Sequence, residues 1–207
     1  MRIPSKIRAT LGVLCAASML CAEATQAALL DRDLDKNGVT DAFYDTDLDI
    51  TWLRDANVKG AQGWNEAATW AAGFSIGAFS DWRLPTADWG CRFSYQCTDG
   101  EIGHLWYVGL GNAVGGGLTN TGGFQNLQSF WYWSGNEASP GSGVAYALDF
   151  RDGRQGTQFT SANINQLYAM AVTNGDVGLI PEPETYALML AGLAGVGLAA
   201  KRRARGD

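Results

Sequence analysis

Oxygen-bearing side chains at alternate positions near the N-terminus are the clearest chemical signal in this 207-residue chain. If Asp33 is position 1 of a calcium-binding loop, then Asp35, Asn37 and Asp41 fall at positions 3, 5 and 9. Gly38 supplies the sharp turn at position 6, and Asp31 could add a ligand from before the loop. Calcium is a hard cation that takes oxygen ligands in a flexible shell. The spacing therefore predicts a calcium site, calcium being the one cofactor expected, with the ligands Asp31, Asp33, Asp35, Asn37 and Asp41.

The last position of this loop departs from the pattern. Tyr44 stands at position 12, where a calcium loop wants a bidentate glutamate. Loss of that ligand predicts weak affinity, in the ~10⁻⁴–10⁻³ M range of extracellular modules. The alternative interpretation is a solvated, aspartate-rich turn in which Asn37 and Gly38 only reverse the chain.

Residues suited to catalysis are scarce. His104 is the sole histidine, which excludes sites that need two imidazole ligands. None of the lysines follows a glycine-rich loop in the way that a phosphate-binding loop requires. We therefore expect no catalytic residue and a protein that is not an enzyme.

Two tryptophans are candidates for ligand binding. A glycine-rich stretch at 110–124 precedes a run of three aromatic residues. In a strand, alternation places Trp131 and Trp133 on one face and Tyr132 on the other. An exposed indole could stack on a sugar ring. The alternative is that all three rings belong to the core.

The ends of the chain carry address signals. Basic residues, an apolar stretch and small residues follow one another over 1–27, which is typical of a secretory signal peptide cleaved after Ala24 or Ala27. At the other end, 181–207 contains a proline-bounded acidic segment, an apolar stretch at 185–200 and a basic tail. The apolar stretch predicts a transmembrane helix whose basic flank stays in the cytoplasm.

The C-terminal order of segments resembles the PEP-CTERM sorting signal of Gram-negative bacteria. The motif residues are Pro181, Glu182 and Pro183. The resemblance implies that exosortase, a membrane protease, recognises this segment and removes the tail. It also implies a protein tethered to the inner membrane by its C-terminal helix, and then released to the cell surface or the extracellular matrix.

Export bears on the cysteines. Cys15 and Cys21 leave with the signal peptide, so only Cys91 and Cys97 remain. Two cysteines in an oxidising compartment predict one disulfide, worth roughly 2 kcal/mol for so short a loop. The alternative is half of a metal site.

The charge balance bears on partners. Residues 28–180 contain 17 acidic and 8 basic residues, a net charge of −9. Nucleic-acid binding requires clustered cations, so we expect no nucleic-acid partner. The acidic residues between 31 and 55 repel one another, and a divalent ion would relieve that repulsion.

The periodicity predicts an α+β fold class with two helices and mainly antiparallel strands. One helix is expected at 65–72, capped by Asn65. A second is expected at 99–110, because Thr98 and Glu101 have capping-box spacing. The Asp152-Gly153 pair predicts a hairpin turn. The strands are expected at 43–44, 50–53, 130–133, 145–150, 155–159 and 168–172.

A second resemblance covers the body of the chain. The blocks 44–53, 64–67, 101–105, 132–137 and 145–150 flank the most specific block, Asp81-Trp82-Arg83-Leu84-Pro85-Thr86. In this order they resemble the Lcl C-terminal domain family. The expected organisation is therefore an aspartate-rich segment at 28–42, the domain at 43–173 and a linker at 174–180.

The family implies a fold similar to C-type lectins and to formylglycine-generating enzymes. It also implies non-catalytic binding of exopolysaccharide or matrix glycan. Two alternatives remain: a structural biofilm or matrix component without a specific ligand, and an enzyme of the formylglycine-generating type, whose relatives work through reactive cysteines. Arg83 either binds a ligand carboxylate or pairs with a neighbouring acid, and the second is the interpretation we favour.

Overall fold

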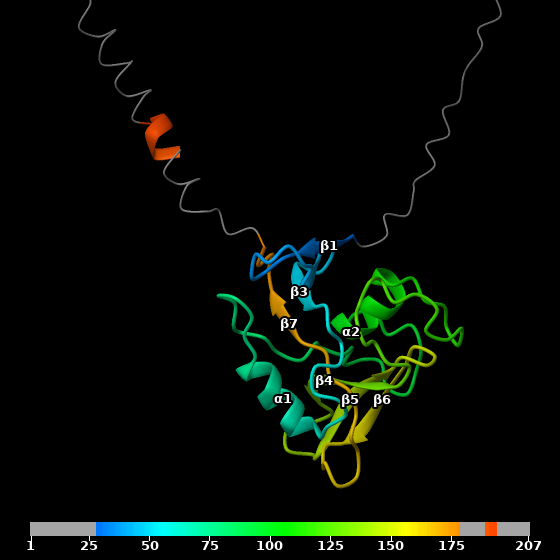
Figure 1. Ribbon diagram of the computed structural model, residues 1–207. Coiled ribbons are helices and arrows are strands. Elements are labelled where there is room, and N and C mark those ends of the chain that lie inside the picture. The colour runs from blue at the N-terminus through cyan, green and yellow to red at the C-terminus, as the bar shows by residue number, and fades with distance from the viewer. Residues whose placement is uncertain (1–27, 179–188, 194–207) are drawn as a thin grey trace, which may run out of the picture.

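A computed structural model describes residues 28–178 and 189–193 (Figure 1). The expected signal peptide at 1–27, the sorting motif and most of the apolar stretch at 185–200 lie outside the described residues. Two antiparallel sheets and few helices make up the described body, which confirms the α+β class in its coarse form. Among the described residues, no helix has the length and apolar character needed to cross a bilayer.

The first sheet has the strand order β1-β2-β3-β7, antiparallel throughout. Its strands are β1 (Leu29–Arg32), β2 (Ala42–Asp45), β3 (Ile50–Leu53) and β7 (Val172–Asn174). The strands predicted at 43–44 and 50–53 are confirmed as β2 and β3, and they pair as a hairpin. The last strand begins later than expected: Tyr168 lies outside it and forms a single parallel bridge to Tyr132.

The second sheet consists of β4 (Trp131–Glu137), β5 (Val144–Asp149) and β6 (Arg154–Phe159), in that order. A register shift between Trp133 and Glu137 interrupts the pairing of β4 with β5. The turn predicted at Asp152-Gly153 joins β5 to β6. Gly153 has a φ of 83°, a left-handed conformation that favours glycine.

Helix α1 (Trp64–Gly73) lies where the periodicity predicts a helix, but it begins one residue earlier. Gly63 occupies the N-cap position, so Asn65 is not the cap. Ala67 and Ala71 are the buried residues of the helix, and they pack in the same cluster as Leu84.

The second helix differs more from the prediction. It consists of one α-helical turn, α2 (Glu101–His104), which continues as a π-helix, η1 (Leu105–Gly109). The capping box predicted at Thr98 is wrong, because Gly100 is the N-cap and no side chain caps the helix. The Glu101 carboxylate is instead engaged by Arg83 and by the Thr86 amide.

The core is built from aromatic side chains. Four tryptophans, Trp52, Trp82, Trp106 and Trp133, are at most 2% exposed. Trp106 meets the ring of Phe150 edge-on, with ring centroids 5.3 Å apart. Since truncation of such a buried ring costs ~3–5 kcal/mol, these residues dominate the stability of the domain.

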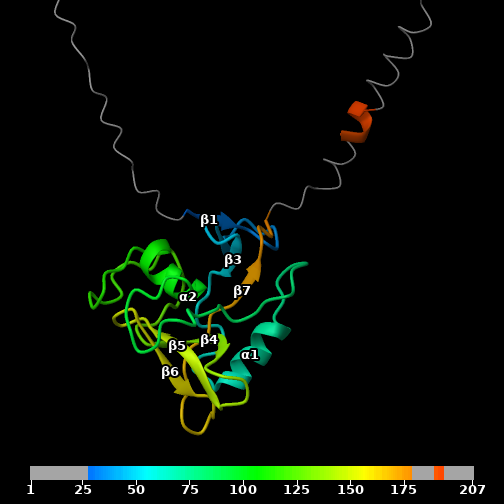
Figure 2. The same cartoon turned by 180° about the vertical axis from the view of Figure 1, so that it is seen from behind.

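The two ends of the folded domain meet. The Arg32 guanidinium at the end of β1 donates two hydrogen bonds of 2.6 Å to the carboxylate of Asp176, just after β7. These hydrogen bonds raise the pKa of Arg32 and lower that of Asp176. Both views show the chain entering and leaving at the same end of the domain, opposite the hairpin of β5 and β6 (Figures 1 and 2).

The contact between α2 and the disulfide loop generates a stability prediction. A Cβ added at Gly103 would overlap the carbonyl oxygen of Cys97, which is backbone and cannot turn aside. We expect Gly103→Ala to destabilise the fold by about 2 kcal/mol or more, by overpacking. The melting temperature followed by circular dichroism should fall by roughly 4–8 °C.

Gly73→Ala is the matched control, since nothing lies within 4 Å of a Cβ at that position. It should leave the melting temperature unchanged or raise it slightly, because alanine favours helix. Equal melting temperatures for the two variants would contradict the tight approach at Gly103.

Candidate functional site

The aspartate-rich loop connects β1 to β2, and its own side chains hold it. The Asp33 carboxylate accepts hydrogen bonds from the amides of Asn37, at 3.1 Å, and Gly38, at 2.7 Å. The Asn37 side-chain oxygen accepts from the Val39 amide at 2.8 Å. Gly38 has a φ of 84°, so the turn predicted there requires a residue that tolerates the left-handed region.

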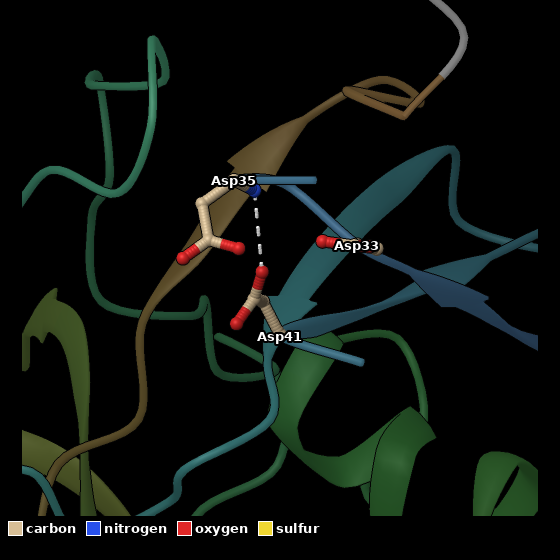
Figure 3. Close-up of side chains that lie close together, drawn as sticks. All are labelled: Asp33, Asp35 and Asp41. Atoms are coloured by element: carbon tan, nitrogen blue, oxygen red, sulfur yellow. Dashed lines mark hydrogen bonds between the residues drawn. The ribbon is translucent and has the colours of Figure 1, made fainter. Parts of the chain in front are cut away.

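Three of the five predicted ligands converge. Oxygens of Asp33, Asp35 and Asp41 all lie within 4.8 Å of one another (Figure 3). Asp41 reaches back across the loop, where it accepts hydrogen bonds from the amides of Leu34 at 2.9 Å and Asp35 at 3.4 Å. Three carboxylates at this separation repel one another, and a cation among them would remove that repulsion.

The other two predicted ligands have different surroundings. Asp31 accepts a hydrogen bond of 3.3 Å from the Thr40 hydroxyl, and it does not belong to the group of three. Asn37 donates its amide nitrogen to Asp35 at 2.9 Å, which ties it into the turn. Tyr44, at position 12, donates its hydroxyl to Asp49, outside this loop.

The two candidate tryptophans differ in exposure. Trp133 is fully buried, and its indole nitrogen donates to the carbonyl of Gln62 at 2.9 Å, so it cannot present a ring to a ligand. Tyr132, on the other face, is fully buried as well. Alternation along β4 could not reveal this, because both faces of the strand are covered. Trp131 is half-buried beside Gly156.

The structure confirms the disulfide between Cys91 and Cys97, with Cα atoms 5.5 Å apart. The loop that it closes is fixed to β6 by the buried side chain of Gln155. That side chain accepts from the Asp88 amide at 3.1 Å and donates to the carbonyls of Asp88 and Cys91. These partners lie between residues 88 and 91, so the Gln155 side chain holds the segment that leads into the disulfide loop against β6.

Arg83 pairs with a neighbouring acid, the interpretation that we favoured. Its guanidinium donates two hydrogen bonds of 2.7 Å to Glu101 and a third to Asn174. Burial by itself would raise the pKa of Glu101, but hydrogen bonds from Arg83 and Thr86 outweigh burial and lower it. This ion pair is a structural element of the domain.

The sequence 73–77 spells Gly-x-Ser-x-Gly, the pattern of a hydrolase nucleophile elbow. The elbow requires a strand before the serine and a helix after it. Here the pattern follows helix α1 and leads into a bridge between Ile76 and Phe79. The Nε2 atom of His104 lies 3.8 Å from Asp47 and has no hydrogen bond within the described part of the chain.

A groove runs beside the exposed face of α1. It is open, has a volume of about 900 Å³, and mixes polar side chains with two rings. Its lining includes Gln62, Asn65, Glu66, Thr69, Trp70 and Phe74. Sequence analysis did not identify this groove. Trp70 and Phe74 are partly buried against the core cluster that contains Trp82, and they also line the groove. Among the residues of α1, alanines alone are buried.

The geometry defines an antiparallel α+β domain with a disulfide, an acidic loop and an open groove. The PEP-CTERM protein-sorting motif matches residues 179–203. The match implies an exported protein that exosortase processes in a Gram-negative bacterium, through membrane-anchored sorting. Comparison with curated proteins and with solved structures finds no significant match to the chain.

The sorting motif generates a processing prediction. In an exosortase-positive host, intact-mass analysis of the protein should show the residues after the motif missing. Replacement of Pro181, Glu182 and Pro183 by alanine should leave the tail attached, because the proline-bounded acidic sequence of the motif is gone. Recovery of the unaltered chain with its complete C-terminus from that host would contradict the prediction.

Proposed function

We propose that the protein is an exported cell-surface or extracellular-matrix protein whose domain binds exopolysaccharide or matrix glycan without catalysis. We also propose that residues 43–173 form a C-type-lectin-like domain related to the Lcl C-terminal family. The sequence blocks quoted above support the relationship, as does a body of antiparallel sheets with few helices. The sorting motif supports an extracellular ligand.

The groove beside α1 is the observation that carries the proposal. The rings of Trp70 and Phe74 lie 5.9 Å apart and tilted by 55°. Sugar rings have apolar faces that pack on aromatic side chains and hydroxyl groups that need polar partners. Asn65, Glu66 and Thr69 supply an amide, a carboxylate and a hydroxyl along the same groove.

The shape of the groove suits a chain ligand. It is open to solvent, so an extended polysaccharide can lie across it without a free chain end. Small-molecule sites, by contrast, enclose most of the ligand surface. Helix α1 buries Ala67 and Ala71, and larger side chains on its other faces line the groove.

Two alternatives predict different behaviour. A structural matrix component would show no specific glycan ligand. An enzyme of the formylglycine-generating type would need reactive cysteines, and Cys91 and Cys97 are bonded to each other. The disulfide therefore favours binding over that chemistry.

A glycan array tests the proposal, with isothermal titration calorimetry of its strongest hit. Trp70→Ala should weaken binding about tenfold, the loss of ~1.4 kcal/mol that one stacking ring contributes. Phe159→Ala is the control, since this ring is 57% exposed at the end of β6 and does not line the groove. A chain without reproducible, competable hits would support the structural alternative, and equal losses in both variants would remove the groove as the site.

We further propose that the aspartate-rich loop binds calcium weakly. The convergence of Asp33, Asp35 and Asp41 favours this proposal. The backbone hydrogen bonds that these carboxylates accept already hold the loop in place, so an ion would add stability to a preformed turn.

Calcium should raise the melting temperature of the purified protein. At a tenfold excess over Kd the gain is about 1.4 kcal/mol, or roughly 3–6 °C. Asp33→Asn/Asp35→Asn should abolish the rise, while Asp81→Asn/Asp99→Asn, which removes two exposed charges elsewhere, should preserve it. If millimolar calcium leaves the melting temperature of the wild-type chain unchanged, the loop binds no calcium and is only a turn.

A further inference from the structure

A second surface, distinct from the α1 groove, consists of exposed aromatic side chains in the loop that the disulfide closes and just before it. Trp89 is 59% exposed, Phe93 52% and Tyr95 40%. Soluble domains rarely expose large apolar side chains together unless a partner covers them. We name this surface the aromatic loop, defined by these three residues with Arg92 and Arg154.

The aromatic loop is held rigidly. The Cys91–Cys97 disulfide closes the part that contains Phe93 and Tyr95, and the buried Gln155 side chain holds the part before it through Asp88 and the Cys91 carbonyl. The amides of Ser94 and Gln155 each donate to the other's carbonyl, at 3.2 and 2.8 Å, and so attach the loop to β6. Trp89 packs edge-on against Tyr146, with ring centroids 5.9 Å apart.

Phe93 stands at the centre under backbone strain. Its φ is 54°, in the left-handed region, which a bulky residue rarely adopts. Strain of this kind persists only where the surroundings enforce it, and it clusters at functional sites. The strained conformation presents the Phe93 ring to solvent beside Trp131, with Gly156 below both rings.

Two arginines lie beside this ring. The guanidinium carbons of Arg92 and Arg154 lie 5.4 and 6.0 Å from the Phe93 ring centroid. Both side chains are exposed, and neither takes part in an ion pair within the described residues.

The acidic groups nearby are engaged internally. Asp88 accepts from the Gly90 amide at 2.8 Å. Asp152 accepts from the Arg154 amide at 3.0 Å and from the Tyr95 hydroxyl at 3.1 Å. Both carboxylates keep their charge but are occupied by donors from the domain itself, whereas no hydrogen bond or ion pair engages the guanidinium groups of Arg92 and Arg154 within the described residues.

We propose that the aromatic loop is a second carbohydrate site, which binds polysaccharide chains whose sugars bear carboxylates. Sugar faces pack on Phe93 and Trp89, and the carboxylates pair with Arg92 and Arg154, which recognise the planar group through paired hydrogen bonds. The proposal is independent of the α1 groove, although both rest on an extracellular location.

The position of the loop favours a polysaccharide over a lipid surface. The aromatic loop lies against β6 of the three-stranded sheet. The chain leaves toward its membrane-sorting motif after β7, on the other sheet. A surface used to contact the tethering membrane would belong beside that exit.

Affinity electrophoresis and calorimetry of the purified protein test the proposal with alginate, a polyuronate, and dextran, a neutral glucan. Wild type should bind alginate in preference to dextran, and added salt should weaken the interaction. Phe93→Ala should weaken alginate binding about tenfold. Arg92→Gln/Arg154→Gln, which leaves the loop backbone unchanged, should weaken it about five- to tenfold.

One control separates a specific loss from a general one. Phe159→Ala removes an equally exposed ring from the far end of β6, and Phe159 belongs to neither proposed site. This variant should bind alginate as wild type does. Equal affinity for dextran, no binding of alginate, losses equal to that of the control, or binding to anionic lipid vesicles in place of alginate would each overturn the proposal.

Discussion

The ion pair between Arg83 and Glu101 connects parts of the domain that are far apart in sequence. Arg83 exchanges two backbone hydrogen bonds of 2.8 Å with Val172, which attaches it to β7. Glu101 opens α2 and accepts from the Thr86 amide at 2.8 Å. The carbonyl of Pro85, the residue before Thr86, accepts a hydrogen bond from the amide of Gly135 in β4. Both sheets and the second helix thus meet at one charged contact, and the removal of either partner would leave an uncompensated charge there.

Local signals in the sequence predicted the parts of the fold that short-range chemistry decides. The β2–β3 hairpin and the Asp152-Gly153 turn follow from residues adjacent in sequence, and both are present. The capping box at Thr98 failed because Glu101 is engaged by Arg83, eighteen residues earlier. The spacing alone contains no information on such a distant competitor. The change from α2 to a π-helix at Leu105 likewise has no local signal that we can identify.

The candidate sites divide in the same way. The convergence of Asp33 and Asp35 with Asp41 could be predicted, because the loop is short and its own side chains shape it. The exposure of aromatic rings could not be predicted. Trp133 is buried and Trp70 lines a groove, a difference set by what packs against each strand or helix. The sequence could not identify the aromatic loop, because no sequence pattern indicates that Phe93 adopts a left-handed backbone conformation.

The meeting of the two domain ends has a consequence for the order of folding. Strand β7 supplies an edge of the first sheet, and Asp176 holds Arg32 across a separation of 144 residues. Contacts of such long range form late, because closing a long loop costs entropy before any contact rewards it. In a chain exported from its N-terminus, the first sheet is completed only once residue 176 has crossed the membrane. The first sheet is therefore completed at about the time that the sorting motif, whose match begins at residue 179, reaches the membrane.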